Sequence, residues 1–143
     1  MTLPGDLPSG HPAAEILARY DGLKVGECIT GHDCATSDVF FRARPADDDD
    51  EEIAGWQHLL NTRLVSIADV HHGHGELFVC SSGRLFLRSY VHDAFGFQGE
   101  SFASGMENLL LGMQTRPMLR PGQQSVTMYG VKYTQESPEL YKY

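Results

Sequence analysis

Residues 76–91 read ELFVCSSGRLFLRSYV, which is two runs of mainly aliphatic and aromatic residues separated by a short polar turn. The turn contains Ser82-Gly83, a pair typical of tight hairpins because glycine takes a positive φ without a clash at Cβ. We therefore expect a β-hairpin built from residues 76–80 and 85–91.

An amphipathic helix is predicted after this hairpin, beyond a loop marked by Gly96 and Gly99. Ser101 is placed to cap the helix and Gly112 to end it. The apolar residues that recur at helical spacing are Phe102, Met106, Leu109, Leu110 and Met113. A hairpin cannot bury both faces alone, and this stripe could cover one of them. We therefore expect an α+β fold, with an antiparallel-rich central sheet packed against helices.

Periodicity and turn signals place the other elements around this core. In chain order they are a helix at 12–20, an extended segment at 23–25, a strand at 38–44, a helix after residue 52, a strand at 63–70 and a strand at 125–133. We expect one domain at residues 12–115, preceded by a flexible tail at 1–11. Residues 116–143 are expected to form a C-terminal extension packed on the same domain.

The composition predicts a single acidic domain and argues against some partners. The 143 residues are 41% hydrophobic, enough for one core, and the net charge of −8 works against binding to phosphate backbones. The arginines on or beside predicted strands are Arg42, Arg44, Arg84 and Arg88. They could form a small basic patch, but the overall charge argues against nucleic-acid binding. The apolar runs are too short to span a bilayer, so no membrane association is expected.

The cysteines and the first residues bear on location. Cys28, Cys34 and Cys80 are odd in number and contain no C-x-x-C pair, which favours free thiols in a reducing compartment over a disulfide framework. Residues 1–10 lack the basic and apolar regions of a signal peptide. We expect a cytoplasmic protein.

Residues 47–52 form an unbroken acidic run, Asp47-Asp48-Asp49-Asp50-Glu51-Glu52. Carboxylates at the start of a helix are stabilised by the helix dipole, so a solvated helix start is the favoured interpretation. Four adjacent aspartates nevertheless exceed what capping needs, because the dipole effect fades within one turn and like charges repel. A partner-binding patch is the alternative.

A histidine loop, His71-His72-Gly73-His74, could ligate a transition metal, with His58 or Asp69 completing the site. Adjacent histidines in a loop tend to point apart, and neither an H-E-x-x-H motif nor a Cys/His pairing is present. We favour a turn between two strands and expect no metal and no other cofactor. No nucleophile motif or glycine-rich phosphate loop indicates catalysis.

Four segments resemble the SUKH superfamily, specifically its third subfamily of bacterial immunity proteins. They are AEILARYDGLKV at 14–25, VFFRARP at 39–45, GELFVCSSGRLF at 75–86 and SFASGMENLLLG at 101–112. Together they cover about residues 12–114 in order and register. The chain departs from the family at Asp21, where a glycine is common, and at residues 65–68, where a proline-isoleucine-glycine turn is usual.

The resemblance implies a SUKH-like fold and a non-enzymatic immunity protein that binds a cognate toxin domain, often a nuclease or nucleic-acid deaminase. An acidic surface would complement the basic cleft of such a toxin. The candidate partner-binding residues are Asp47, Asp48, Asp49, Asp50, Glu51, Glu52, Glu76, Asp93 and Glu100. Two alternatives stay open, namely a metal protein or enzyme that uses the histidine loop, and a regulatory binding domain of the same fold without a toxin partner.

Overall fold

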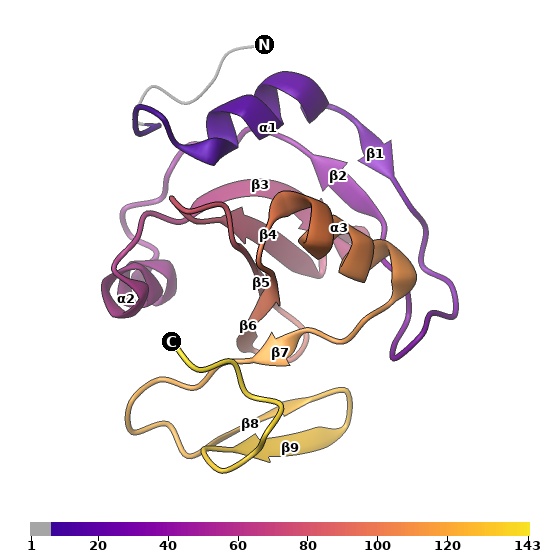
Figure 1. Ribbon diagram of the computed structural model, residues 1–143, viewed down its shortest axis with the longest axis vertical. Coiled ribbons are helices and arrows are strands. Elements are labelled where there is room, and N and C mark those ends of the chain that lie inside the picture. Colours follow the sequence, from indigo (N-terminus) through magenta and orange to yellow (C-terminus); the bar gives the residue numbers. More distant parts are fainter. Residues whose placement is uncertain (1–6) are drawn as a thin grey trace.

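The described part of the chain, residues 7–143 of a computed structural model, is built on one antiparallel sheet (Figure 1). Its strands follow the chain order: β1 (Lys24–Val25), β2 (Val39–Phe41), β3 (Val65–Val70), β4 (Gly75–Val79), β5 (Leu85–Ser89), β6 (Ala94–Gly99) and β7 (Arg116–Pro117). The helices are α1 (Pro12–Tyr20), α2 (Glu51–Leu60) and α3 (Phe102–Leu111), with a short 3-10 turn η1 (His71–Gly73). The predicted α+β class is confirmed.

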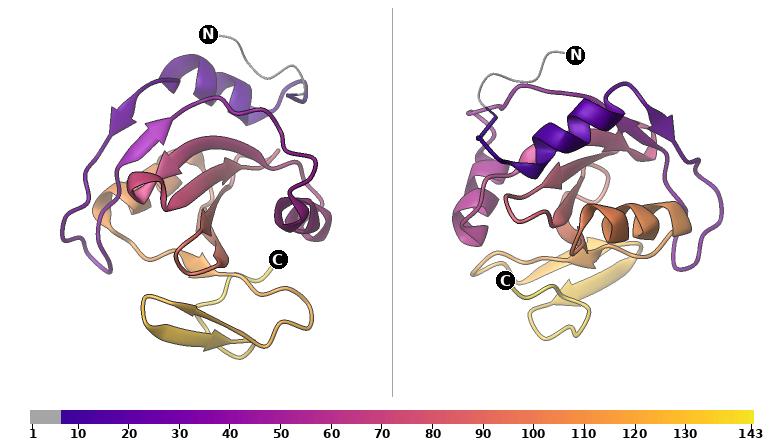
Figure 2. Two further views of the ribbon diagram at one scale, coloured as in Figure 1. Left: turned by 180° about the vertical axis from the view of Figure 1, so that it is seen from behind. Right: turned by 45° about the horizontal axis from the view of Figure 1, so that its top comes forward.

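Helices cover both faces of the sheet because successive residues of a strand direct apolar side chains to opposite faces. On β4, Leu77 belongs to one buried cluster with Leu17 of α1 and Leu109 of α3. The next residue, Phe78, belongs to a second cluster with Trp56 of α2. Figures 1 and 2 show α2 and α3 on different sides of the strands. The core is therefore two apolar layers separated by the sheet.

The predicted hairpin and final helix are confirmed, although β5 ends at Ser89 and not at residue 91. Gly83 has a φ of 94° in the turn between β4 and β5. Ser101 caps α3 through a capping box with Ser104, and Gly112 ends it with a φ of 74°. Two positions of the predicted apolar stripe are wrong, because Leu110 is 39% exposed and Met113 lies beyond the end of α3.

The predicted loop around Gly96 and Gly99 is wrong, because these residues belong to strand β6. Both glycines allow close packing rather than a turn. A Cβ on Gly99 would stand 2.5 Å from Cα of Gly105 in α3, and one on Gly96 would stand 2.8 Å from the carbonyl oxygen of Arg116. Glycine in a strand marks such close approach of another backbone as readily as it marks a break.

The single strand predicted at 125–133 is also wrong. The segment is a hairpin of β8 (Ser125–Met128) and β9 (Val131–Thr134). Tyr129 and Gly130 between them both have positive φ, 53° and 76°, as a two-residue turn of the primed type requires. Val126 and Tyr133 of this hairpin share a buried cluster with Ala94 of the main sheet.

The predicted tail at 1–11 lies only partly within the described residues, since residues 1–6 fall outside them. His11 is 4% exposed. Its Nδ1 accepts a hydrogen bond from the backbone N–H of Ala13 at 3.1 Å, which caps α1, and its Nε2 lies 3.0 Å from the carbonyl oxygen of Arg63.

Replacement of Leu109 by Ala tests the α1/α3 core. We expect Leu109→Ala to lower the free energy of unfolding by about 2–5 kcal/mol, because it leaves a cavity among buried side chains. Leu111→Ala on the same helix removes a side chain that is 53% exposed and should change stability by about 0.5 kcal/mol or less. Equal effects of the two variants in denaturant unfolding would contradict this assignment of the helix faces.

Replacement of Gly99 tests the close contact between β6 and α3. Gly99→Ala should cost about 2–3 kcal/mol, because the added methyl group meets the backbone of Gly105 and α3 must move. Gly83→Ala should cost about 1 kcal/mol, because its Cβ has open space and only the left-handed backbone is strained. Thermal and denaturant unfolding of both variants measures the difference, and a costlier Gly83→Ala would reverse the conclusion.

Candidate functional site

Glu76 of β4 points to the face of the sheet that carries α2. Its register partner on β3 is Asp69, and the pairing of β3 with β4 shifts between Ser66 and Ala68. This β-bulge adds one residue to β3. Ser66 and Asp69, which regular alternation would place on opposite faces, therefore both lie on the face of Glu76.

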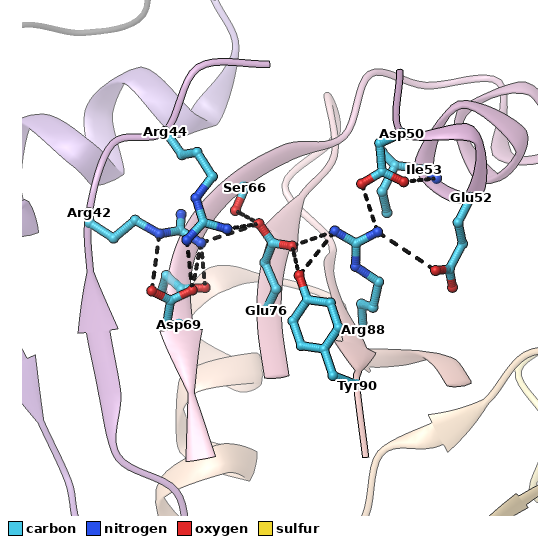
Figure 3. Close-up of polar contacts among 11 residues, drawn as sticks. Arg42, Arg44, Asp50, Glu52, Ile53, Ser66, Asp69, Glu76, Arg88 and Tyr90 are labelled. Carbon is cyan, nitrogen blue, oxygen red and sulfur yellow. Dashed lines mark hydrogen bonds and ion pairs between the residues drawn. The ribbon is translucent and has the colours of Figure 1, made fainter. Parts of the chain in front are cut away.

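One oxygen of Glu76, Oε2, binds groups from β3 and from the segment after β2 (Figure 3). It accepts hydrogen bonds from the hydroxyl of Ser66, from Arg44 at 2.9 Å and from Arg42 at 3.2 Å. The two guanidinium groups also bind Asp69, Arg42 at 2.8 Å and Arg44 at 3.3 Å. This half of the network therefore balances two cations with two carboxylates.

The other oxygen, Oε1, binds groups that follow from the pairing of β4 with β5. Arg88, directly opposite Glu76 in the register, donates to it at 2.6 Å, and the hydroxyl of Tyr90 donates at 2.8 Å. Arg88 reaches onward to α2, where its Nη1 lies 2.7 Å from Asp50 and 3.6 Å from Glu52. The network thus joins β3, β4, β5, the segment after β2 and the start of α2.

The pKa values follow from this arrangement. Burial opposes the ionised form of Glu76, which is 2% exposed, but hydrogen bonds from Ser66, Arg88 and Tyr90 and the charge of Arg88 outweigh it and lower the pKa of Glu76. For Glu52, burial is the larger effect and raises the pKa, and the charge of Arg88 offsets it only in part. Glu76 is therefore an ionised group in a saturated set of hydrogen bonds, poorly suited to accept a substrate proton.

A cleft of about 450 Å³ opens beside this network, between α2 with its preceding loop and the strands. Its apolar wall includes Ile53, Leu64 and Phe78, and Arg44 and Tyr90 also line it. This mixture of an apolar wall with a few polar groups is typical of a binding site. The cleft is the candidate functional site.

The acidic run divides into paired and unpaired carboxylates. Asp50 accepts a hydrogen bond from the backbone N–H of Ile53, which caps α2, and also binds Arg88. Residues 47–49 are exposed, and within residues 7–143 none of them forms an ion pair. Asp47 and Asp48 line the cleft. The run therefore starts α2 at Asp50, as the favoured interpretation predicted, and residues 47–49 form an exposed acidic edge.

The remaining candidate acids lie in different places. Glu76 is buried inside the network and is not part of an acidic surface. Asp93 is exposed in the turn before β6, close enough to Glu52 for its charge to raise the pKa of that group. Glu100 is exposed in a separate hollow with Arg19 of α1.

The strand arginines, which could have formed a basic patch, are instead bound to neighbouring groups of the protein. Arg42 and Arg44 bind Asp69 and Glu76, as described above. Arg84 donates a hydrogen bond to the hydroxyl of Tyr141 at 2.7 Å. Asp69, considered as an additional metal ligand, is held by these arginines instead.

The histidine loop does not bring its three imidazoles together as a ligand set. The one group of potential metal ligands found within residues 7–143 is Cys28, Asp38 and His72. Of the histidines at 71, 72 and 74, only His72 therefore takes part.

Sequence reasoning missed the network because its members come from five segments. Two signals were present in the sequence. Glu76 stands at the start of one apolar strand, and Arg88 stands inside the next. The pairing register and the bulge, which decide that these groups meet, could not be read from either segment alone.

Fold and site together define an α+β domain with a cleft beside a self-compensated charge network. Within residues 7–143, no helix has the length and apolar character needed to cross a membrane. A family model described as SUKH-3 immunity protein matches residues 10–112, more than half of the chain. The chain therefore belongs to the SUKH-3 immunity protein family, as the resemblance predicted, and this family is generally non-enzymatic. Comparison with curated proteins and with solved structures gives no match.

Neutralising Glu76 tests the network. Glu76→Gln should lower the free energy of unfolding by about 3 kcal/mol or more at neutral pH, because it removes the buried carboxylate that Arg42 and Arg88 share. The pKa of Glu76 is lower in the folded protein than its ordinary value of 4.5. The ionised carboxylate therefore stabilises the fold above that pH, and its contribution disappears as the pH falls through the folded-state pKa.

The stability difference between the parent and Glu76→Gln should thus shrink in acid. Denaturant unfolding across a pH series measures it. Glu107→Gln, which changes an exposed residue of α3, is the control and should follow the parent throughout. A penalty for Glu76→Gln that is small or independent of pH would contradict a central role for this carboxylate.

Proposed function

We propose that this protein is a cytoplasmic immunity protein that binds a cognate toxin domain, a nuclease or a nucleic-acid deaminase, and blocks its basic active-site cleft. Membership of the SUKH-3 immunity protein family supports the immunity role. The observation that carries the choice of surface is the exposed, unpaired acidic edge at residues 47–49 beside the cleft.

The division of charges supports this choice. The buried carboxylates near the cleft are compensated by arginines, so their fields largely cancel outside the protein. Residues 47–49 project uncompensated charge into solvent. A toxin that binds nucleic acid needs a positive surface, and the two surfaces would accelerate encounter by electrostatic steering.

The cleft offers a surface for close apolar contact, which electrostatic steering alone does not provide. Tyr90 is 53% exposed at its edge, and tyrosine is enriched among residues that dominate binding energy. The apolar wall formed by Ile53 and Phe78 can bury part of a partner side chain. We infer that residues 47–49 mainly set the association rate and that Tyr90 with the cleft wall mainly sets the dissociation rate.

The first experiment is co-expression with the toxin domain encoded beside the gene. We expect the two proteins to purify as a complex and the toxin to lose its activity on nucleic acid. Failure of this chain to bind or inhibit that domain would remove the toxin partner from the proposal and favour a regulatory binding domain of the same fold.

The acidic edge is tested by a triple variant, Asp47→Asn, Asp48→Asn and Asp49→Asn. Asp50 is left intact because it caps α2 and binds Arg88. We expect association with the toxin domain to slow several-fold at low salt and much less at high salt, since screening weakens steering. Folding should be unchanged. Stopped-flow kinetics across a salt series measures the effect.

A matched control removes three negative charges elsewhere, by changing Glu107, Glu136 and Glu139 to Gln. These residues are exposed and lie away from the cleft lining. A slower on-rate in the control, equal to that of the aspartate variant, would show that only net charge matters. An unchanged on-rate in the aspartate variant would contradict a part for residues 47–49 in association and would favour a solvated helix start alone.

A further inference from the structure

A cysteine, an aspartate and a histidine meet at one end of the strands β1, β2 and β3, away from the contacts of Glu76. Asp38 directly precedes β2, and the antiparallel register pairs Val39 with Val70. Asp38 therefore lies beside the turn η1 that follows β3, where His72 is found. Cys28 follows β1, which pairs with the other side of β2. The sheet register thus gathers three segments that are distant in sequence.

The side-chain atoms of these residues converge. Sγ of Cys28 lies 3.4 Å from Oδ1 of Asp38, and Nδ1 of His72 lies 3.2 Å from Oδ2 of Asp38. All three ligand atoms lie within 4.8 Å of one another. In a tetrahedral zinc site, the bond lengths of sulfur, nitrogen and oxygen ligands place neighbouring ligand atoms roughly 3.3–3.5 Å apart. The sulfur and the nitrogen each lie at about that distance from an oxygen of Asp38, the sulfur from Oδ1 and the nitrogen from Oδ2.

The backbone holds these groups in place from the protein side. Asp38 is 5% exposed, and its Oδ1 accepts a hydrogen bond from the backbone N–H of His72 at 2.8 Å. His71 and His72 have φ values of 50° and 56°, a left-handed conformation that residues other than glycine adopt uncommonly. The hydroxyl of Ser37 accepts from the backbone N–H of His71 at 3.1 Å. Two consecutive residues are thus fixed in a costly conformation that directs His72 toward Asp38.

We propose that Cys28, Asp38 and His72 bind one Zn²⁺ ion. A thiolate, a carboxylate and a neutral imidazole are the three ligand types that zinc accepts, and their combined charge of about −2 would balance the cation. Three protein ligands leave a fourth position for water or for a group from a partner. The ion would tie the segment between β1 and β2 to the histidine loop.

Lys24 is the competing cation at this site. Its Nζ lies 3.6 Å from Oδ2 of Asp38, and its side chain is 60% exposed. A bound metal ion would balance the charge of Asp38 in place of the ammonium group. Zinc therefore displaces the ammonium group into solvent. This site differs from the one that the histidine spacing suggested, because two of its three ligands lie outside residues 71–74.

The test uses the full-length, untagged protein with Zn²⁺ and Co²⁺ as probes. We expect one Zn²⁺ per chain by calorimetry, and a thiolate-to-cobalt charge-transfer band when Co²⁺ is bound. Cys28→Ser and His72→Asn should each weaken binding at least about tenfold, since loss of even an outer partner of a metal ligand has effects of that size. Asparagine is chosen because it tolerates the left-handed conformation. Lys24→Met should tighten binding.

Two variants from the same loops are the controls. Cys34→Ser and His74→Asn remove a second thiol and a second imidazole that are not members of the cluster, and both should bind zinc as the parent does. Absence of zinc binding by the folded parent would overturn the proposal. So would binding that Cys28→Ser leaves unchanged, or a cobalt spectrum without the thiolate band. These readouts require no toxin and are independent of the proposed immunity function.

Discussion

A carboxylate that is 2% exposed at the start of a central strand imposes the strongest constraint on this structure. Removing a charge from water costs several kcal/mol unless opposite charges and hydrogen bonds replace the solvent. Glu76 meets that requirement with donors from β3, from β5 and from the segment after β2, and Arg88 extends the contacts to the cap of α2. The position of α2 against the sheet, and with it the cleft, therefore depends on the compensation of one buried charge.

The opposite face of the sheet is organised by a different kind of constraint. Leu17, Leu77 and Leu109 pack there in one buried apolar cluster. The close approach of α3 depends on glycine, because a methyl group on Gly99 would meet the backbone of Gly105, and one on Gly105 would meet the side chain of Leu85. One face thus carries a polar network with a cleft, whereas the other carries a closely packed apolar layer.

The two kinds of acidic residue have separate consequences. Glu76, Asp69 and Asp50 use their charge internally, where it fixes the positions of strands and helix. Residues 47–49 are exposed, so their charges face the solvent. Asp50 of the first set directly follows residues 47–49 in the chain, so internal and exposed carboxylates adjoin at the start of α2.

The sequence by itself determined the α+β class, the hairpin turn at Gly83, the capped helix at Ser101 and the family, because these depend on local periodicity, turn chemistry and motif order. It did not reveal β6, since a glycine that allows close packing reads locally like one that breaks a strand. Only the tertiary structure decided which charges meet. A bulge of one residue sets the face on which Ser66 lies, and strand register brings Asp38 to His72 across the sheet, so neither contact is encoded within a single segment.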